Sequence, residues 1–189
     1  MRPRKVWLPE AAAFYRAALG CPCRPLLPME PRRKPNQRGR SQQAQRNVDA
    51  AVRYAATKFR TMMEQIEKAD LPEPWRDFPR AGCDLASQVL GRFLCEMLGV
   101  AVTTVYGERD FPDLGHYTHR WLDCESLTVD VTADQFGQSP VIVSRDSPWH
   151  RGFHGIKQIE LTEDTQWFES YCATVLARFE EYIASDPSS

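Results

Sequence analysis

The hydrophobic period of the chain changes twice, and this change constrains the fold more than any other feature. Between residues 41 and 98 the apolar residues recur with the three- and four-residue spacing of amphipathic helices. Between residues 100 and 144 there are four short runs rich in Val, Thr, Tyr and Trp, a composition typical of β-strands. A helical period returns from Thr162 to Ala184. Helices, then strands, then a closing helix predict an α+β fold with a small antiparallel sheet.

The helices have predicted boundaries. One helix is expected over residues 41–69, and a proline-rich loop, "LPEPWRDFPRAG", follows it. A second helix begins at or near Cys83 and ends at Gly99, a residue that readily takes the left-handed conformation of a helix end. In the closing helix, Thr162 is the expected N-cap because acidic residues follow it in the first turn. The four expected strands lie in "VAVTTVYGE", "YTHRWLDCE", "LTVDVTAD" and "PVIVS".

The N-terminal part of the chain differs from the rest. A short helix is predicted over Pro9–Leu19, followed by "CPCRPLLPMEPRRKPNQRGRSQ", which holds five prolines and six Lys or Arg residues. Such a composition predicts a loop or linker. We therefore divide the chain into a basic, proline-rich arm over residues 1–40 and one folded domain over residues 41–189.

The charges are distributed unevenly. Residues 1–60 carry a net charge of +11 and the remaining residues a net charge of −12, although the whole chain is at −1. A basic arm can bind nucleic acid or a membrane surface, or it can pack against the acidic body of the same protein. The basic stretch over residues 24–40 has no interleaved aromatic residues that could stack on bases, which argues against a nucleic-acid partner.

Apolar runs and cysteines indicate the compartment. No apolar run reaches the roughly 20 residues that cross a bilayer, and the basic start lacks the continuous apolar stretch of a signal peptide. A cytoplasmic location is expected, with export by a signal-independent route as the alternative. The six cysteines are predicted to be free thiols. Cys21 and Cys23 are too closely spaced for a zinc knuckle, and no metal or cofactor site is predicted.

Cys83 lies where the proline-rich loop becomes a helix. A thiol at a helix N-terminus is close to the positive end of the macrodipole and to unpaired N–H groups, and both favour the thiolate. A nucleophilic cysteine needs this position. The alternative is a structural role, because cysteine is often buried and packs as a small hydrophobic residue.

His119 and Asp130, which lie later in the sequence, complete a catalytic set with Cys83. His119 and Asp130 lie on consecutive predicted strands, and the tip of the hairpin is expected near Glu125. This places His119 and Asp130 close to being cross-strand neighbours, so the carboxylate can orient the imidazole. An oriented imidazole can take the proton of the thiol and later return it to a leaving group.

Three motifs together resemble the transglutaminase-like branch of the papain-like cysteine peptidase superfamily. "GCDLASQVL" resembles its nucleophile helix, "HRWLD" its His-x-Trp motif, and "TVDVTADQF" the strand with the aspartate of the triad. The resemblance covers residues 76–145. It implies Cys83 as nucleophile, His119 as general base and acid, and Asp130 as its orienting partner. It also implies a transglutaminase-like catalytic domain over residues 41–189, with a papain-like core to which N- and C-terminal helices are added.

The function expected from these residues is a cysteine-dependent hydrolase that cleaves peptide or protein amide bonds through an acyl-thioester. One alternative is a transglutaminase- or deamidase-type effector or toxin that modifies a protein glutamine. A second alternative is a binding module that keeps the fold without turnover. The expected partner is a peptide or protein substrate, and the sequence does not predict an oligomeric state.

Further residues are assigned to the cleft with alternatives. Trp121 and Gln135 are predicted to contact substrate, while Trp121 can also be a core aromatic residue and Gln135, like Asp134, can assist the oxyanion or cap a turn. His116 is the alternative general base. The backbone N–H of Cys83 is the expected first oxyanion donor, and the second is expected from the loop before it.

The remaining histidines and one cysteine receive no role in the site. His150 and His154 are interpreted as loop residues because Pro148, Gly152 and Gly155 surround them, with metal binding as the alternative. Cys95 is interpreted as a structural residue of the helix that begins near Cys83.

Overall fold

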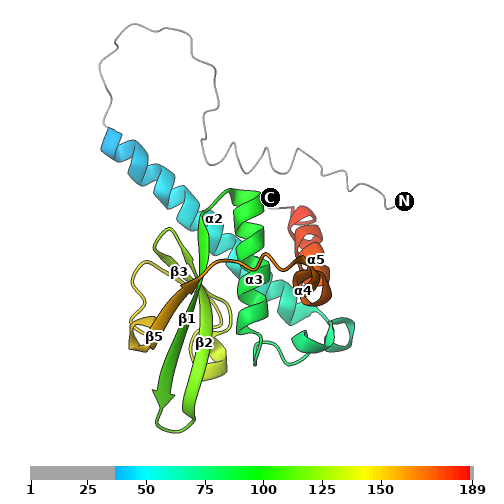
Figure 1. The fold of residues 1–189 in the computed structure, drawn as a ribbon. Coiled ribbons are helices and arrows are strands. Elements are labelled where there is room, and N and C mark those ends of the chain that lie inside the picture. The colour runs from blue at the N-terminus through cyan, green and yellow to red at the C-terminus, as the bar shows by residue number, and fades with distance from the viewer. Residues whose placement is uncertain (1–36, 188–189) are drawn as a thin grey trace, which may run out of the picture.

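A computed structural model of the chain describes residues 37–187 and has an α+β fold (Figure 1). Its strands form one antiparallel five-stranded sheet with the order β4-β3-β2-β1-β5. They are β1 (Val102–Phe111), β2 (Gly115–Cys124), β3 (Leu127–Asp130), β4 (Ile142–Ser144) and β5 (His154–Ile159). The predicted α+β class with a small antiparallel sheet and the four predicted strands are therefore confirmed. The fifth strand, β5, was not predicted.

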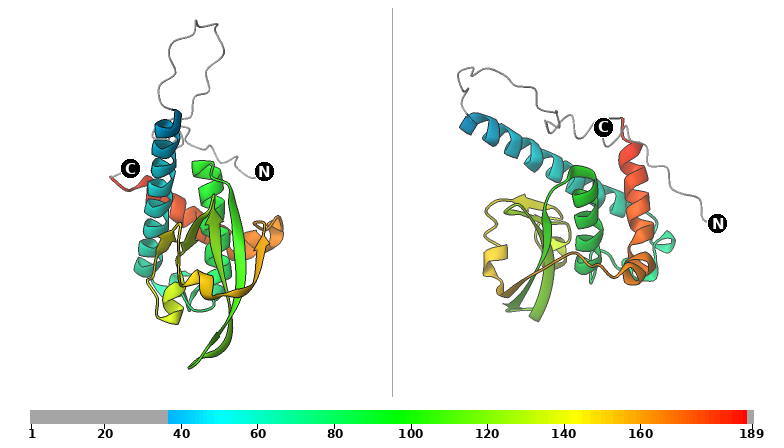
Figure 2. Two further views of the ribbon diagram at one scale, coloured as in Figure 1. Left: turned by 90° about the vertical axis from the view of Figure 1, so that its left-hand side faces the viewer. Right: turned by 45° about the horizontal axis from the view of Figure 1, so that its top comes forward.

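Four α-helices lie within the described residues, and they pack on one side of the sheet. They are α2 (Gln37–Gln65), α3 (Cys83–Phe93), α4 (Thr165–Tyr171) and α5 (Ala173–Ala184). Figures 1 and 2 show α3 between the sheet and α5, with α2 crossing beside both. No helix of residues 37–187 is long and apolar enough to cross a bilayer.

Aromatic residues hold the helical layer together. Phe59 of α2 is fully buried and makes edge-to-face contacts with Trp75, Phe78 and Phe179. The Trp75 indole donates a hydrogen bond of 2.6 Å to the carbonyl of Tyr171, between the two C-terminal helices. The proline-rich loop before α3 is thereby packed into the core, which holds the start of α3 in place.

Two turns set the geometry of the sheet near β2. The β1–β2 hairpin is in register to its tip, where Phe111 pairs with Gly115, and it projects beyond the helices (Figure 1). The β2–β3 hairpin turns through Glu125 and Ser126, which both have left-handed backbone angles. A two-residue turn of this kind matches the twist of the strands and fixes their register. The hairpin tip lies where it was predicted.

The helix boundaries differ from the predictions in three places. The helix α2 begins at Gln37 and ends at Gln65, earlier at both ends than predicted. The closing helix is split at Cys172 into α4 and α5, and the predicted N-cap is wrong. The side chain of Asp164, not that of Thr162, accepts the hydrogen bond from the N–H of Trp167. The predicted helix Pro9–Leu19, Cys21 and Cys23 lie outside the described residues.

Candidate active site

Cys83 is the first residue of α3, as predicted. The chain enters the helix through Ala81, whose φ of 53° is in the left-handed region that non-glycine residues rarely occupy. Gly82 follows as the N-cap, and a Cβ there would lie 3.1 Å from the ring of Phe78. The sharp turn therefore depends on a residue without a side chain next to the cysteine. The thiol of Cys83 is free and half-buried.

The first turn of α3 has no side-chain cap. Its first intrahelical hydrogen bond runs from the N–H of Ala86 to the carbonyl of Gly82, so the N–H groups before Ala86 lie outside the helical ladder. Asp84 forms an ion pair with Arg120 of β2. This contact joins the residue after Cys83 to the residue after His119, and it ties the helix start to the strand.

His119 and Asp130 form a buried hydrogen-bonded pair. His119 Nε2 lies 2.7 Å from Asp130 Oδ2, and the two side chains are 0% and 1% exposed. The other carboxylate oxygen, Oδ1, accepts hydrogen bonds from the backbone N–H and the hydroxyl of Thr132, at 2.8 and 3.1 Å. Asp130 therefore holds the imidazole with a carboxylate that is itself fixed.

The register explains this contact in a slightly different way from the prediction. Leu122 pairs with Val129 across the β2–β3 hairpin. Extending that ladder by one pair puts Asp130 opposite Trp121, so His119 is the diagonal neighbour on the same face. A diagonal neighbour is within reach of a long side chain, and the structure brings the two predicted residues together.

The electrostatics of the pair follow from its burial. Burial lowers the pKa of His119, but the charge of Asp130, its hydrogen bond and the interaction with Cys83 outweigh this and raise the pKa to about 9. Burial likewise opposes ionisation of Asp130. The charge of His119 and the hydrogen bonds from both imidazoles outweigh burial and hold the pKa of that carboxyl below its usual range. The pair is therefore an imidazolium and a carboxylate at neutral pH.

The side chain of Cys83 interacts with the imidazole of His119. Its side chain is close enough to contribute a hydrogen bond and a charge interaction to the raised pKa of His119. Because Asp130 occupies Nε2, Nδ1 is the ring nitrogen available to the thiol. Cys83 therefore interacts with His119, which is itself hydrogen-bonded to Asp130.

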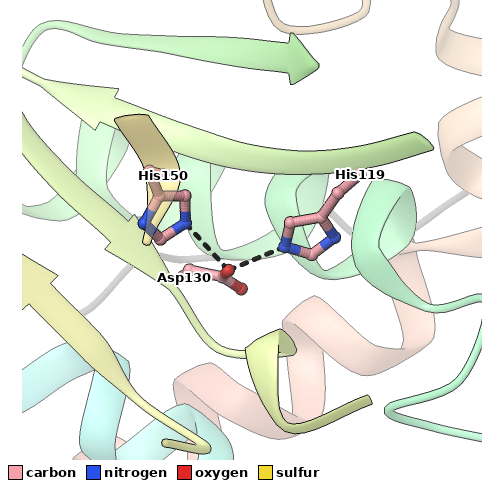
Figure 3. A group of neighbouring side chains, drawn as sticks. All are labelled: His119, Asp130 and His150. Carbon is pink, nitrogen blue, oxygen red and sulfur yellow. Dashed lines mark hydrogen bonds and ion pairs between the residues drawn. The ribbon is translucent and has the colours of Figure 1, made fainter. Parts of the chain in front are cut away.

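His150 is a residue of the site that the sequence did not indicate. It was interpreted as a loop residue, yet it is buried and its Nε2 lies 3.1 Å from the same oxygen, Asp130 Oδ2 (Figure 3). Its Nδ1 lies 2.7 Å from the hydroxyl of Ser147. The only local signal was the pair of large aromatic residues, Trp149 and Phe153, on either side of it, which indicates a segment that packs inward.

His119, Asp130 and His150 offer the ligand types that zinc prefers, and their ligand atoms lie within 4.8 Å of one another. Ligands of a tetrahedral ion at about 2.1 Å are roughly 3.4 Å apart. The two nitrogen–oxygen distances of 2.7 and 3.1 Å are shorter than that and match hydrogen bonds. The group is therefore described as a hydrogen-bonded network.

Aromatic rings surround the imidazole of His119. The ring centroids of Phe136, Trp149 and Trp121 lie 5.2, 5.5 and 5.8 Å from that of His119. Trp121 is only 5% exposed and also contacts His150, so it forms the wall behind both imidazoles. Its predicted contact with substrate stays a prediction. The rings keep water away from the buried charges, which strengthens their interaction.

Gln135 lies at the open side of the imidazole. Its Nε2 donates a hydrogen bond of 3.0 Å to the carbonyl of Thr132 and lies 3.5 Å from His119 Nδ1. The amide therefore lies beside the ring nitrogen of His119 that Asp130 does not contact. A contact between Gln135 and substrate stays a prediction.

Asp134, His116 and His154 lie outside the network. Asp134 accepts two hydrogen bonds from Arg60, at 2.9 and 2.7 Å, and so anchors the loop after β3 to α2. His116 is exposed on the β1–β2 hairpin, 2.9 Å from Asp110, and cannot serve as the base. His154 was interpreted as a loop residue but is the first residue of β5, where it is also exposed.

The remaining described cysteines are free thiols, as predicted. Burial raises the pKa of Cys124 and of Cys172 to about 12. Burial also raises the pKa of Cys95, which is half-buried in the π-helical turn that continues α3. These three cysteines therefore resemble structural thiols and provide internal references for Cys83.

Comparison of the chain with protein-family models, curated proteins and solved structures gives no match.

Proposed function

We propose that the protein is a cysteine-dependent hydrolase of peptide or protein amide bonds, with Cys83, His119 and Asp130 as its catalytic triad. The observation that carries the proposal is the chain of contacts from a thiol at a helix start, through a buried imidazole, to a buried carboxylate. This arrangement activates a cysteine nucleophile. The proposal includes a papain-like arrangement in which α3 carries the nucleophile and the sheet carries the other two residues.

The chemistry uses each residue at a defined atom. In the resting ion pair the proton of the Cys83 thiol is already on His119 Nδ1, and the thiolate sulfur attacks the carbonyl carbon of the amide. His119 then gives this proton to the leaving amine as the carbon–nitrogen bond breaks, which leaves an acyl-thioester on Cys83. His119 next takes a proton from water, whose oxygen attacks the thioester. As the carbon–sulfur bond breaks, the acid is released and the sulfur leaves as the thiolate, which again pairs with the protonated His119.

The developing oxyanion needs hydrogen-bond donors. The uncapped N–H groups at the start of α3 supply them, beginning with that of Cys83, and the helix dipole adds to their effect. Gln135 is the nearest side-chain amide to His119 Nδ1, and we assign it a supporting contact with the substrate carbonyl. Asp130 takes no proton in this scheme, because its role is to orient and stabilise the imidazolium.

The alternatives of a transglutaminase or a deamidase use the same triad and differ only in the acceptor and the amide attacked. Hydrolysis is favoured because water is the default acceptor unless a site excludes it. The three outcomes are separated by incubating the protein with unlabelled casein and putrescine. Mass spectrometry then distinguishes shortened peptides, glutamine converted to glutamate, and glutamine carrying the amine.

The first test is the rate at which iodoacetamide alkylates each cysteine between pH 5 and 8. At pH 6 we expect Cys83 to react at least about 10-fold faster than Cys95, because a thiolate paired with an imidazolium forms below neutral pH whereas a buried thiol stays protonated. Peptide mass spectrometry assigns the rate to each cysteine. Cys124 and Cys172, which are buried, should stay unmodified.

Two variants complete this test. His119→Ala should remove the advantage of Cys83, while His116→Ala, at an exposed histidine outside the network, should leave it within about 3-fold of the native rate. If Cys83 is alkylated only after denaturant is added, the triad is not functional. The protein would then be better described as a binding module with this fold.

A further inference from the structure

The scheme above uses one imidazole, but two imidazoles donate to the same carboxylate oxygen. Asp130 Oδ2 lies 2.7 Å from His119 Nε2 and 3.1 Å from His150 Nε2, and Figure 3 shows the carboxylate between the two rings. All three side chains are at most 5% exposed. A buried histidine in direct contact with the orienting carboxylate therefore has no role in the chemistry proposed so far.

The neighbours of His150 determine how it contacts Asp130. Ser147 Oγ lies 2.7 Å from His150 Nδ1. In the neutral tautomer that donates its Nε2–H to Asp130, Nδ1 accepts a hydrogen bond from the Ser147 hydroxyl. The carboxylate of Asp130 only accepts and therefore fixes the proton on His150 Nε2, while the Ser147 hydroxyl, which can donate or accept, satisfies Nδ1. Trp121, with its ring centroid 4.8 Å from that of His150, keeps the ring in this orientation.

The titratable groups that face His119 come from three elements. Cys83 comes from α3, Asp130 from the end of β3, and His150 from the turn that precedes β5. Gln135 adds an uncharged amide, and the other contacts of the ring are aromatic. Asp134 is engaged with Arg60 and does not take part. Of these groups, only Asp130 and Cys83 act directly on the protonation of His119.

A hydrogen bond to one oxygen of a carboxylate stabilises its negative charge and weakens its attraction for a second donor at that oxygen. We propose that His150 is a positioning residue that shares Asp130 Oδ2 with His119, holding the carboxylate in place and limiting its pull on the imidazolium. The inference rests on the proposed function, in which His119 must return its proton to the leaving group. An imidazolium held too tightly by Asp130 would be too weak an acid for that step.

The test is the titration of His119 followed by NMR in protein labelled with ¹⁵N in its imidazole rings. His150→Leu removes the hydrogen-bond donor and keeps a side chain of similar size, so His119 is then the only imidazole that donates to Asp130 Oδ2. We expect the midpoint of His119 to rise by roughly 0.5–1 pH unit. The exposed His116 and His154 serve as references whose midpoints should not move.

Two further variants separate this role from simple packing. His150→Gln keeps an N–H near the position of Nε2, so the midpoint should return to within about 0.3 unit of the native value. Ser147→Ala leaves His150 Nδ1 without its hydroxyl partner and holds the ring less firmly against Asp130, so the midpoint should shift in the same direction as in His150→Leu, by less. Ser147→Ala also provides the test if His150→Leu fails to fold. A midpoint that stays unchanged or falls in the folded variants overturns the proposal.

Alkylation separates this inference from the proposed function. In His150→Leu, Cys83 should still react with iodoacetamide at pH 6 faster than Cys95, because the imidazolium that pairs with it is retained. If Cys83 is inert in the native protein, the proposed function fails, while the titration still decides whether His150 shares the charge of Asp130. If Cys83 is reactive and the midpoint does not rise, only the role of His150 fails.

Discussion

Asp130 is the residue on which the charges of the site depend. It accepts hydrogen bonds from His119, from His150 and, at its other oxygen, from the N–H and the hydroxyl of Thr132. An ionised carboxylate this deeply buried is stable only with such partners. The sequence identified Asp130 and His119 because a hairpin relates them. It could not identify His150, because no period of helix or strand relates residues 130 and 150.

The change Asp130→Asn tests the charge of this residue without changing its shape. Without the carboxylate, burial dominates and lowers the pKa of His119, so less imidazolium is present at pH 6 to pair with Cys83. We expect alkylation of Cys83 at pH 6 to fall at least about 10-fold, while the rate at Cys95 stays constant. Rates at each cysteine are measured as for the native protein.

Asp134→Asn is the matched control for this prediction. Asp134 is four residues further along the same loop but is paired with Arg60 and is not in contact with His119. The rate at Cys83 should stay within about 3-fold of native. Equal losses in both variants would mean that the loop, and not the charge of Asp130, controls the thiol.

At the scale of elements, Arg60 connects α2 to the loop that carries the site. The guanidinium is buried and donates to both oxygens of Asp134 and, at 3.0 Å, to the carbonyl of Val131. The loop between β3 and β4 therefore has its position set by a helix about 70 residues earlier in the chain. Helical periodicity predicted α2 but not the contact of Arg60 with the loop, because a charged residue on a helix is ordinarily assigned to the solvent-exposed face.

Arg60→Met tests this connection. The change keeps an apolar side chain of similar length but leaves the carboxylate of Asp134 and the carbonyl of Val131 without their donor. We expect a loss of about 2–3 kcal/mol in the free energy of unfolding, measured by urea denaturation. Arg46→Met on the exposed part of the same helix should change it by less than about 0.5 kcal/mol. Equal effects would show that Arg60 contributes only helix propensity or packing.

The strand β5 shows why some elements escape prediction. All its residues are exposed, and Gly155 within it has a left-handed φ of 59°. A strand without a buried face has no alternation of apolar and polar residues, which is the signal used to predict strands. Only pairing with the edge of β1 makes it a strand. The four strands that were predicted each have buried residues.

At the scale of the whole molecule, the His119–Asp130 pair makes stability depend on pH. The folded protein holds the pKa of His119 at about 9, above its ordinary value of 6.5, so the folded state binds more protons than the unfolded state between these values. This contribution to stability is fully present below about pH 6.5 and is lost as the pH rises through about 9. The interaction with Cys83 also contributes to the raised pKa of His119, so the contribution of Asp130 is isolated by removing the thiol.

The measurement is therefore made in Cys83→Ala. We expect its free energy of unfolding to fall by about 2 kcal/mol between pH 6.5 and 9, relative to the double variant Cys83→Ala, Asp130→Asn. Urea denaturation at a series of pH values gives both curves. Parallel curves over this range would show that Asp130 does not hold a proton on His119.

The sequence by itself determined the α+β class, the order of the long helices and the first four strands, and Cys83, His119 and Asp130 as candidate site residues. These features depend on local periodicity, on a helix start and on a two-residue hairpin turn, all of which are encoded within short segments. Only the tertiary structure decided that His150 shares the Asp130 carboxylate, that Arg60 anchors the loop after β3, and that β5 joins the sheet. Each of these contacts joins residues 20 or more positions apart. They arise from the packing of elements, which periodicity does not record.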